Sequence, residues 1–346
     1  MQPPNPHLLA LFQKRIDGDD ALLELARLRF KQTGLGTEFY ASSPEELKRL
    51  LRFRPDDTSP VTVHLPRDVN LLKPKYSTWI IHYMTAFAGV VDGFILHDQA
   101  EILTPPYQAA LAEIDRALQN CQAGPMLFIE YAAGLAPAVF CELHEQLKGL
   151  PRVSACIDIG HLGIYYAREL YRRSHPGHDI CVLTPTDPEL PDLITDIQDT
   201  VEQVLNKVLT VVRQLAGLGK ALHFHLHDGH PLSTFSPFGV SDHLSFFSKI
   251  PIPFTFKGKK ELNTMFGPDG LEKIIAAVTS LPALAQLSFT LEIHPVRGRL
   301  PLGDAAYLFR HWRIKTNAEQ MNYWLSVLTE NHHLLSAIIN RQGLKV

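Results

Sequence analysis

The sequence predicts an α/β fold and, within that class, a (β/α)8 barrel of the TIM type. Short apolar runs alternate with longer segments of helical periodicity, which is the pattern of parallel β/α units. Six of these runs finish on a histidine or a carboxylate, and a barrel brings the C-terminal ends of its strands to one mouth. A doubly wound open sheet is the alternative, but no glycine-rich phosphate fingerprint follows the first run.

Seven strands can be traced along the chain. We expect them at residues 37–40, 61–64, 93–97, 126–130, 221–227 and 287–292, with one more ending at Asp158. Residues 8–32 carry apolar positions at helical spacing, so the barrel is expected to begin irregularly or to lack its first strand.

Helices are predicted between these strands. Ser43-Pro44-Glu45-Glu46 has the N-cap, N1 and N3 residues of a helix start, and that helix runs to about Phe53. A long amphipathic helix is expected over about 191–218, another from 268, and helical segments from about 304 to the end.

The chain is expected to form a single domain over residues 1–346, with a barrel core at about 36–312. Residues 174–191 and 231–257 are predicted insertions that shape the mouth, and 313–346 a C-terminal helical extension. The extension has an apolar face that either closes the barrel base or meets a partner; its members are Met321, Trp324, Leu325, Leu328 and Leu335.

Composition limits the classes of function. Lys and Arg number 33 against 36 Asp and Glu, and no basic block indicates a broad nucleic-acid surface. The sequence has neither an apolar run of roughly 18 residues nor a signal peptide at its start, so no membrane partner is expected. Four cysteines without CxxC spacing indicate reduced thiols and a cytoplasmic location. Seventeen histidines are the unusual feature, and nothing indicates an oligomeric state.

The segment Cys156-Ile157-Asp158-Ile159-Gly160-His161 predicts a metal site. Asp158 ends a buried strand and His161 lies on the segment leaving it. A carboxylate removed from water must be paired or metal-bound, and Asp with His is a common ligand combination. The plainer interpretation is a capping Asp and a loop His.

The same design recurs at other strand ends. The candidate ligands are His64, His97, Glu130, Asp158, His225 and Glu292. Three carboxylates in one buried mouth repel each other unless cations lie between them. Satisfied polar strand ends remain the alternative. Alternation places His223, His225 and His227 on one side of their strand, where His223, or His294 on the last strand, is expected to orient a carboxylate. Asp228 is a candidate for the same role.

Four segments give the chain a resemblance to the xylose-isomerase-like TIM-barrel superfamily (AP endonuclease family 2), and within it to the endonuclease IV family. They are Phe128-Ile129-Glu130-Tyr131-Ala132-Ala133-Gly134, the segment around Asp158, His225-Leu226-His227-Asp228, and Leu291-Glu292. The likeness covers about residues 60–295, and its motifs are specific for the superfamily rather than for one reaction.

The resemblance implies two or three divalent ions per chain, Zn²⁺ or Mn²⁺. One ion would bind His64, His97 and Glu130. Glu130 would bridge to a second ion, whose other ligands would be Asp158, His225 and Glu292. A third would bind His161 together with Asp242 and His243, a pair that departs from the family's Asp-x-His spacing. Asp228-Gly229-His230 has that spacing but follows His225 too closely.

Two reactions compete. In phosphoester hydrolysis, bound ions lower the pKa of a water to roughly 7, Glu130 bridges the ions and Glu292 positions the nucleophile. In a sugar or sugar-phosphate isomerase or epimerase with one ion, Glu130 and Glu292 form the acid–base pair. Because one-ion chemistry does not need His64 and His97, hydrolysis is favoured.

The expected substrate is a small phosphorylated or polyhydroxylated molecule. A nucleic acid is less favoured, since Arg67 and Lys73-Pro74-Lys75 are the only basic candidates near the mouth. Arg297 and Arg299 are either anion ligands or solvated charges. A non-catalytic metal-binding protein is the third class.

Overall fold

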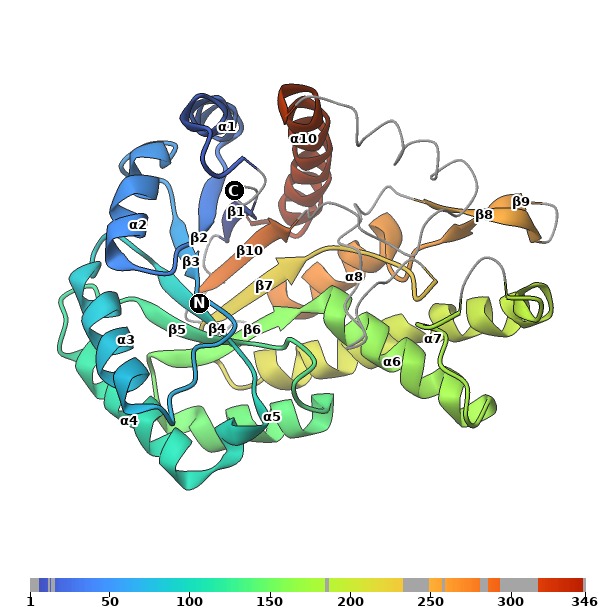
Figure 1. Ribbon diagram of the computed structural model, residues 1–346, viewed down its shortest axis with the longest axis horizontal. Helices are drawn as coiled ribbons and strands as arrows, with labels where there is room; N and C mark the ends of the chain where they lie inside the picture. The colour runs from blue at the N-terminus through green and yellow to red at the C-terminus, as the bar shows by residue number, and fades with distance from the viewer. Residues whose placement is uncertain are drawn as a thin grey trace.

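Eight parallel strands form a closed barrel in the computed structural model of the chain (Figure 1). Around the barrel the order is β1-β10-β7-β6-β5-β4-β3-β2. The strands are β1 (His7–Leu11), β2 (Gly36–Tyr40), β3 (Val61–His64), β4 (Gly93–His97), β5 (Met126–Glu130), β6 (Val153–Asp158), β7 (Leu222–Leu226) and β10 (Leu287–Glu292). The structure describes residues 6–11, 13, 16–183, 187–232, 249–256, 259–280, 286–292 and 317–344. The predicted barrel class is confirmed.

The first strand is present, and the helical interpretation of residues 8–32 was wrong for its beginning. His7–Leu11 pairs with β10 on one side and β2 on the other, which closes the barrel. The core therefore begins near residue 7 rather than 36. A five-residue run in which four residues are buried has no alternation of polar and apolar residues, so its period does not distinguish strand from helix.

Helices cover the outside of the barrel (Figure 1). They are α1 (Asp20–Thr33), α2 (Pro44–Leu50), α3 (Pro74–Ala86), α4 (Pro105–Gln119), α5 (Pro137–Gln146), α6 (Ile159–Ser174), α7 (Leu190–Ala216), α8 (Gly267–Thr279) and α10 (Asn317–Arg341). Single 3₁₀ turns occupy Leu51–Phe53, Ala100–Leu103 and Leu147–Gly149. Ser43 caps α2 as predicted, because its side chain accepts from the Glu46 amide.

The two predicted insertions differ. Residues 175–183 and 187–189 connect α6 to the long helix α7. The second insertion was expected to be a loop, but β8 (Lys249–Phe256) pairs with β9 (Lys259–Asn263) as an antiparallel hairpin. Residues 233–248 lie outside the described residues, as do 304–316, where a helix was expected.

The last helix completes the outer ring. α10 packs against α1, α8 and β10, next to the first helix of the barrel. Four members of its predicted apolar face are buried there: Met321, Leu325, Leu328 and Leu335. The side chain of Trp324 lies outside the described residues. This face therefore closes the side of the ring rather than the barrel base.

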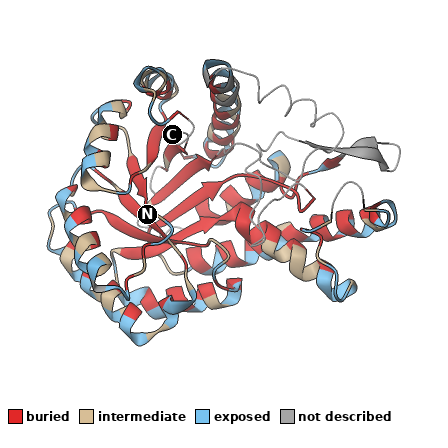
Figure 2. Ribbon diagram, viewed as in Figure 1, coloured by how far each residue is buried: buried red, intermediate tan, exposed pale blue. Residues whose placement is uncertain are grey.

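Apolar side chains form two cores. The larger lies between the strands and the surrounding helices, and the strands are almost entirely buried (Figure 2). The smaller fills the barrel interior and consists of Ile95, Met126, Phe128, Cys156 and Ala221. On β5, Met126 and Phe128 share a face with Glu130, so the polar layer at the mouth rests on this apolar interior.

Among the described helices, none combines the length and apolar character that crossing a bilayer requires.

Candidate metal centre

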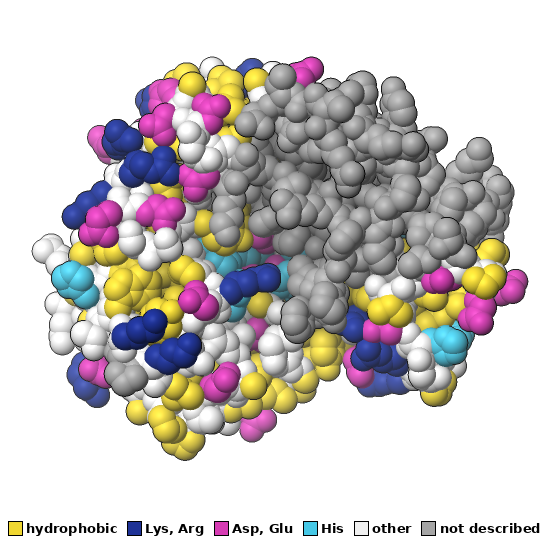
Figure 3. Space-filling view, viewed as in Figure 1, with side chains coloured by type: hydrophobic (Ala, Val, Ile, Leu, Met, Phe, Trp, Pro, Cys, Tyr) yellow, Lys and Arg dark blue, Asp and Glu magenta, His cyan; other side chains and the backbone are white. Residues whose placement is uncertain are grey.

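The predicted strand-end side chains meet at one mouth of the barrel. Backbone register places His97 beside Glu130 and Asp158 beside His225. All except His97, which is partly exposed, are buried. Histidine side chains can be seen from outside at the centre of the face shown in Figure 3, next to a basic side chain. The polar strand ends are therefore one cluster and not a set of separate caps.

The first group consists of His64, His97 and Glu130. The Nε2 atoms of the two histidines lie 2.9 and 3.2 Å from Oε2 of Glu130. Nδ1 of His64 is 3.0 Å from the carbonyl oxygen of Leu65 and donates to it. That bond leaves the Nε2 lone pair directed at the cluster, as in a metal-binding histidine.

A second group surrounds His225. Its Nδ1 lies 3.3 Å from Oε1 of Glu130 and 3.4 Å from Oε2 of Glu292. One ligand atom from each of Glu130, Asp158 and His225 falls within 4.8 Å of the others. The two oxygens of Glu130 thus face two different sets of histidines, which is the arrangement of a carboxylate able to bridge two cations.

Glu38 is a buried carboxylate that the sequence reasoning missed. Its Oε1 lies 2.9 Å from Nε2 of His225, and its Oε2 accepts from Nε2 of His223 at 2.9 Å. The hydroxyls of Thr62 and Thr290 also donate to Oε2. Burial opposes ionisation of Glu38, but the two histidines outweigh it and lower the pKa of Glu38 well below its usual range. Glu38 is therefore an anion that fixes the ring of His225 from below.

His223 orients a carboxylate, as the alternation on β7 suggested. The carboxylate is that of Glu38, and the other ring nitrogen of His223 lies 2.6 Å from Oγ of Ser288. The available signal for Glu38 was a charged residue within the strand at 37–40.

A third group joins the end of β6 to β7. One ligand atom from each of Asp158, His161 and His227 lies within 4.8 Å of the others. Oδ1 of Asp158 accepts from the His161 amide at 2.7 Å and so caps α6, as the plainer interpretation of Asp158 proposed. Burial, together with the charges of Glu292 and Glu130, raises the pKa of Asp158 to about 7 although His161 opposes the shift. A cation would offset both the burial of this carboxylate and its repulsion by Glu292 and Glu130.

The spacing Glu130-x-x-x-Gly134 has a local cause. Asp98, in the loop after β4, accepts from the amides of Ala132, Gly134 and Leu135 at 2.9–3.0 Å. A Cβ at Gly134 would lie 2.6 Å from the carbonyl oxygen of Asp98. Glycine therefore allows this loop to approach Asp98, which fixes the chain that leaves Glu130.

Asp228 does not orient a ligand, contrary to the expectation. It accepts from the Phe266 and Gly267 amides and from the Thr264 hydroxyl, so it holds the start of α8. His230 is buried, and its Nδ1 accepts from the Leu232 amide. The remaining candidates Asp242, His243, His294, Arg297 and Arg299 lie outside the described residues.

Tyr40 borders the mouth at the end of β2. Its ring centroid lies 4.5 Å from that of His64. Burial and the nearby Glu292 and Glu130 carboxylates raise the pKa of Tyr40 well above its usual value, so its hydroxyl stays protonated. Arg67 is exposed, and its charge contributes to lowering the pKa of His97, after the larger effect of burial.

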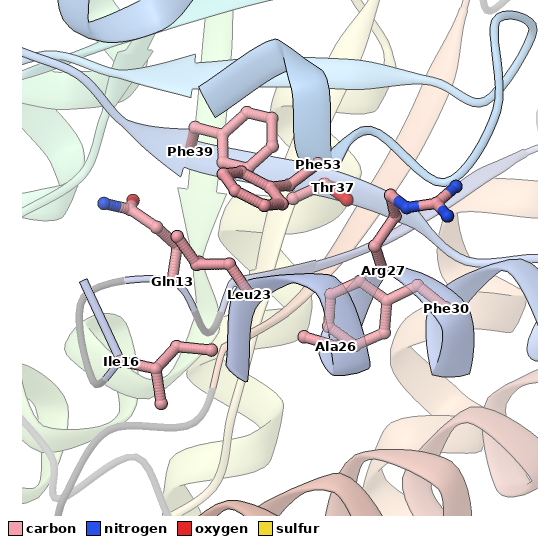
Figure 4. A pocket seen from close by; sticks show the side chains of 9 residues that line it. All are labelled: Gln13, Ile16, Leu23, Ala26, Arg27, Phe30, Thr37, Phe39 and Phe53. Carbon is pink, nitrogen blue, oxygen red and sulfur yellow. The ribbon is translucent and has the colours of Figure 1, made fainter. Parts of the chain in front are cut away.

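The pocket drawn in Figure 4 is separate from this cluster. It lies between α1 and β2, where Leu23, Phe30, Phe39 and Phe53 line it. Its volume of about 10 Å³ has room for one water at most, so it holds no substrate.

Comparisons with known proteins give no family. No family model and no curated protein matches the chain. Among solved structures, a GH10 endoxylanase from a sugarcane soil metagenome is similar with a TM-score of 0.41 and 11% identity, over 83% of this chain and 86% of that one. A protein assigned as a fructose-1,6-biphosphate aldolase from Coccidioides immitis has a TM-score of 0.36 and 10% identity, over 98% and 91%. Both are too distant to bear on activity, and the barrel assignment rests on the strand pairing itself.

Proposed function

We propose that this chain is a divalent-metal-dependent enzyme of the xylose-isomerase-like superfamily that hydrolyses phosphoesters, as the endonuclease IV family does. The observation that carries the proposal is the position of Glu130. Its Oε2 faces His64 and His97, and its Oε1 faces His225. A one-ion reaction has no use for the first two histidines.

The residues fit a pair of Zn²⁺ or Mn²⁺ ions. His64, His97 and Glu130 would hold the first ion, while Asp158, His225 and Glu292 would share Glu130 in holding the second. Nitrogen and carboxylate ligands suit both metals. When bound, such ions lower the pKa of a coordinated water and neutralise charge on the phosphoryl group.

The chain's own groups would orient the metal-binding histidines. Glu38 holds the His225 ring, and the Leu65 carbonyl holds the His64 ring. Glu292 would orient the attacking water, and the position of its Oε2 near the same nitrogen of His225 as Glu130 supports this role. Tyr40 and Arg67 border the mouth and offer a hydroxyl donor and a positive charge to a phosphoryl oxygen. A small phosphorylated substrate suits this mouth better than a nucleic acid, and the four free thiols suit the cytoplasm.

An isomerase or epimerase is the second candidate, supported by one distance pair. Glu130 and Glu292 lie 3.3 and 3.4 Å from the same nitrogen of His225. Both carboxylates therefore lie at the same part of the mouth, where they could act as the acid and base of a proton transfer on a polyhydroxylated substrate.

The test combines metal content with a substrate screen. We expect at least two ions per chain, and we expect His64→Ala and His97→Ala each to lose one ion and at least 100-fold of phosphodiesterase activity. His144→Asn, at a buried histidine of α5, is the control and should keep both. The screen sets phosphomonoesters, phosphodiesters and an abasic duplex against aldoses, ketoses and their phosphates.

Full activity in the His64 and His97 variants, or turnover of sugars alone, would favour the isomerase. Fewer than one ion per chain after incubation with Zn²⁺ or Mn²⁺ would refute both enzymes. Metal binding without turnover of any of these substrates would indicate a non-catalytic metal-binding protein.

A further inference from the structure

A polar pocket lies at the amino end of the barrel, opposite the mouth. Its walls are the segments that lead into β4, β5, β6 and β10, together with Arg54 from the connection before β3. Its volume is about 240 Å³, which gives room for a small metabolite, whereas the pocket beside α1 has room for one water at most. We call it the basal pocket.

Two arginines line the basal pocket, and both have unused N–H donors. Arg54 donates from Nε to the carbonyl oxygen of Ser59 at 2.7 Å, and its Nη2 donates to the same oxygen. Arg152 donates from Nη1 to the carbonyl oxygen of Gly124 at 2.7 Å. Within the part of the chain that the structure describes, these carbonyl oxygens are the only hydrogen-bond partners of the two guanidinium groups. A guanidinium has more donors than these bonds use, so both side chains are held in place and can still bind an oxyanion.

The side chains of the basal pocket carry an excess of positive charge. Among the described residues that line it, Asp92 contributes the one carboxylate, and Oδ2 of Asp92 accepts from the Val61 amide at 2.7 Å. Both arginines are half-buried, which reduces screening by water and strengthens their attraction for an anion. A phosphate group suits such a wall, because its oxygens accept several N–H bonds from fork-shaped donors.

The backbone of the basal pocket has an unusual conformation. Ala123 and Gly89 both line the pocket, and both are left-handed, with φ angles of 51° and 76°. The Gly89 amide donates to the carbonyl oxygen of Ala123 at 3.0 Å. Alanine is strained in this region, whereas glycine is not. Strained residues concentrate at ligand sites, so the conformation of Ala123 supports a binding role for this wall.

The basal pocket is separate from the metal centre. Met126 lines the pocket, while Glu130 lies at the mouth on the same strand, which places the two about 13 Å apart along β5. The apolar core of the barrel interior, which includes Phe128, fills the space between them. A molecule in the basal pocket therefore does not reach the groups at the mouth, and it would act on the fold rather than as the substrate.

We propose that the basal pocket binds the phosphate group of a small molecule, either inorganic phosphate or a phosphomonoester, through Arg54 and Arg152. Gln286 also lines the pocket and offers a side-chain amide to the same ligand. The ligand stabilises the folded chain, because the unfolded chain has no such site. This proposal goes beyond the function proposed above and does not depend on it.

The experiment is a calorimetric titration of the chain as purified with inorganic phosphate and with glycerol 3-phosphate, at constant ionic strength. We expect saturable binding with a Kd below about 1 mM. Arg54→Gln and Arg152→Gln should each weaken binding by at least about 10-fold, since each removes a charge-assisted contact. Arg213→Gln, at an exposed position on α7 outside the pocket, is the matched control and should bind as the wild type does. His64→Ala, at the mouth, should also keep this binding, which distinguishes it from phosphate held at the metal centre.

Gln286→Glu is a second kind of variant, because it leaves both arginines and their bonds to the backbone in place. The new carboxylate repels phosphate and competes for the arginines, so we expect it to weaken binding as much as the arginine variants do, in a chain that circular dichroism shows to be folded. Phosphate should raise the unfolding temperature of the wild type and of Arg213→Gln, but not that of Gln286→Glu. If an arginine variant fails to fold, Gln286→Glu decides the question.

Three outcomes would overturn the proposal. They are equal phosphate affinity in Gln286→Glu and the wild type, succinate binding as tightly as phosphate, and loss of all phosphate binding in His64→Ala. Phosphate binding at the basal pocket of a chain that holds no metal would refute the proposed function and leave this inference intact. A metal-loaded, active chain without basal phosphate binding would do the reverse.

Discussion

At the scale of single residues, the orientation of a candidate metal-binding histidine depends on the group that contacts its other ring nitrogen. His225 meets Glu130 and Glu292 with one nitrogen and Glu38 with the other. An imidazole held by a carboxylate is a more basic and better oriented ligand than a free one. Glu38 itself accepts hydrogen bonds from His223, Thr62 and Thr290. The network that orients His225 therefore includes side chains inside the barrel, below the mouth.

Glu38→Gln tests that role. The amide keeps the shape of the side chain but loses the charge that holds His225, so we expect metal affinity to fall about 10- to 100-fold. Competition with a chromophoric chelator measures the affinity. Glu45→Gln, at an exposed position on α2, is the control. Unchanged affinity in Glu38→Gln would show that Glu38 serves the packing of the barrel and not its metal centre.

Single residues also show which parts of the site can be predicted from the local sequence. The strand-end histidines and carboxylates were predictable, because each follows an apolar run and polarity at a strand end is a local signal. Glu38 was not, because it lies in the middle of a strand and only the closed barrel brings it below His225. His227 was recognised on the correct face of β7, but its contact with Asp158 depends on the space at Gly160.

At the scale of elements, buried histidines outside the mouth have a different role. His144 on α5 packs against Phe140, with ring centroids 4.7 Å apart. Burial, assisted by the charge of Lys220, lowers the pKa of His144 to about 3. The helix therefore requires a neutral ring, and the histidines of this chain do not form one functional class.

The neutral ring of His144 makes the stability of the folded chain depend on pH. The folded pKa lies below the value of about 6.5 in the unfolded chain, so the unfolded state binds the extra proton between these values. The contribution of His144 to the free energy of unfolding is fully present above pH 6.5. It is lost as the pH falls toward 3, by about 1.4 kcal/mol per pH unit.

We therefore expect the wild type to lose more stability than His144→Asn between pH 6.5 and 4.5, measured by urea unfolding. Any metal released at low pH would affect both proteins equally and cancel in the difference. The same substitution at exposed His82 of α3 is the control. A difference between wild type and His144→Asn that does not change with pH would contradict the buried neutral ring.

At the scale of the whole molecule, the first strand closes the barrel and also shapes its mouth. Leu11 stands level with Glu38 on one side and Glu292 on the other. β1 therefore contributes an apolar side chain at the level where its two neighbouring strands contribute carboxylates. Leu9, one pleat below, is fully buried.

Because β1 closes the barrel, we expect truncation of one buried side chain in it to destabilise the fold strongly. Leu9→Ala should cost about 2–5 kcal/mol of the free energy of unfolding, because it leaves a cavity in the barrel. Equilibrium urea unfolding measures the loss. Leu25→Ala on α1 removes the same atoms from a side chain that is 37% exposed, and it should cost far less. Equal costs at the two positions would show that β1 is not an integral strand.

By itself the sequence determined the barrel class, seven of its strands and the six histidines and carboxylates that end them. These features follow from the alternation of apolar runs with helical segments and from polarity at each run's end, which are local properties. Only the tertiary structure decided that residues 7–11 form a strand, that Glu38 lies under His225, and that His227 reaches Asp158. The first two depend on closure of the barrel, which brings together residues as far apart in the sequence as Glu38 and Thr290. The third depends on the pairing of β6 with β7 and on the space at Gly160, and no local pattern encodes any of these contacts.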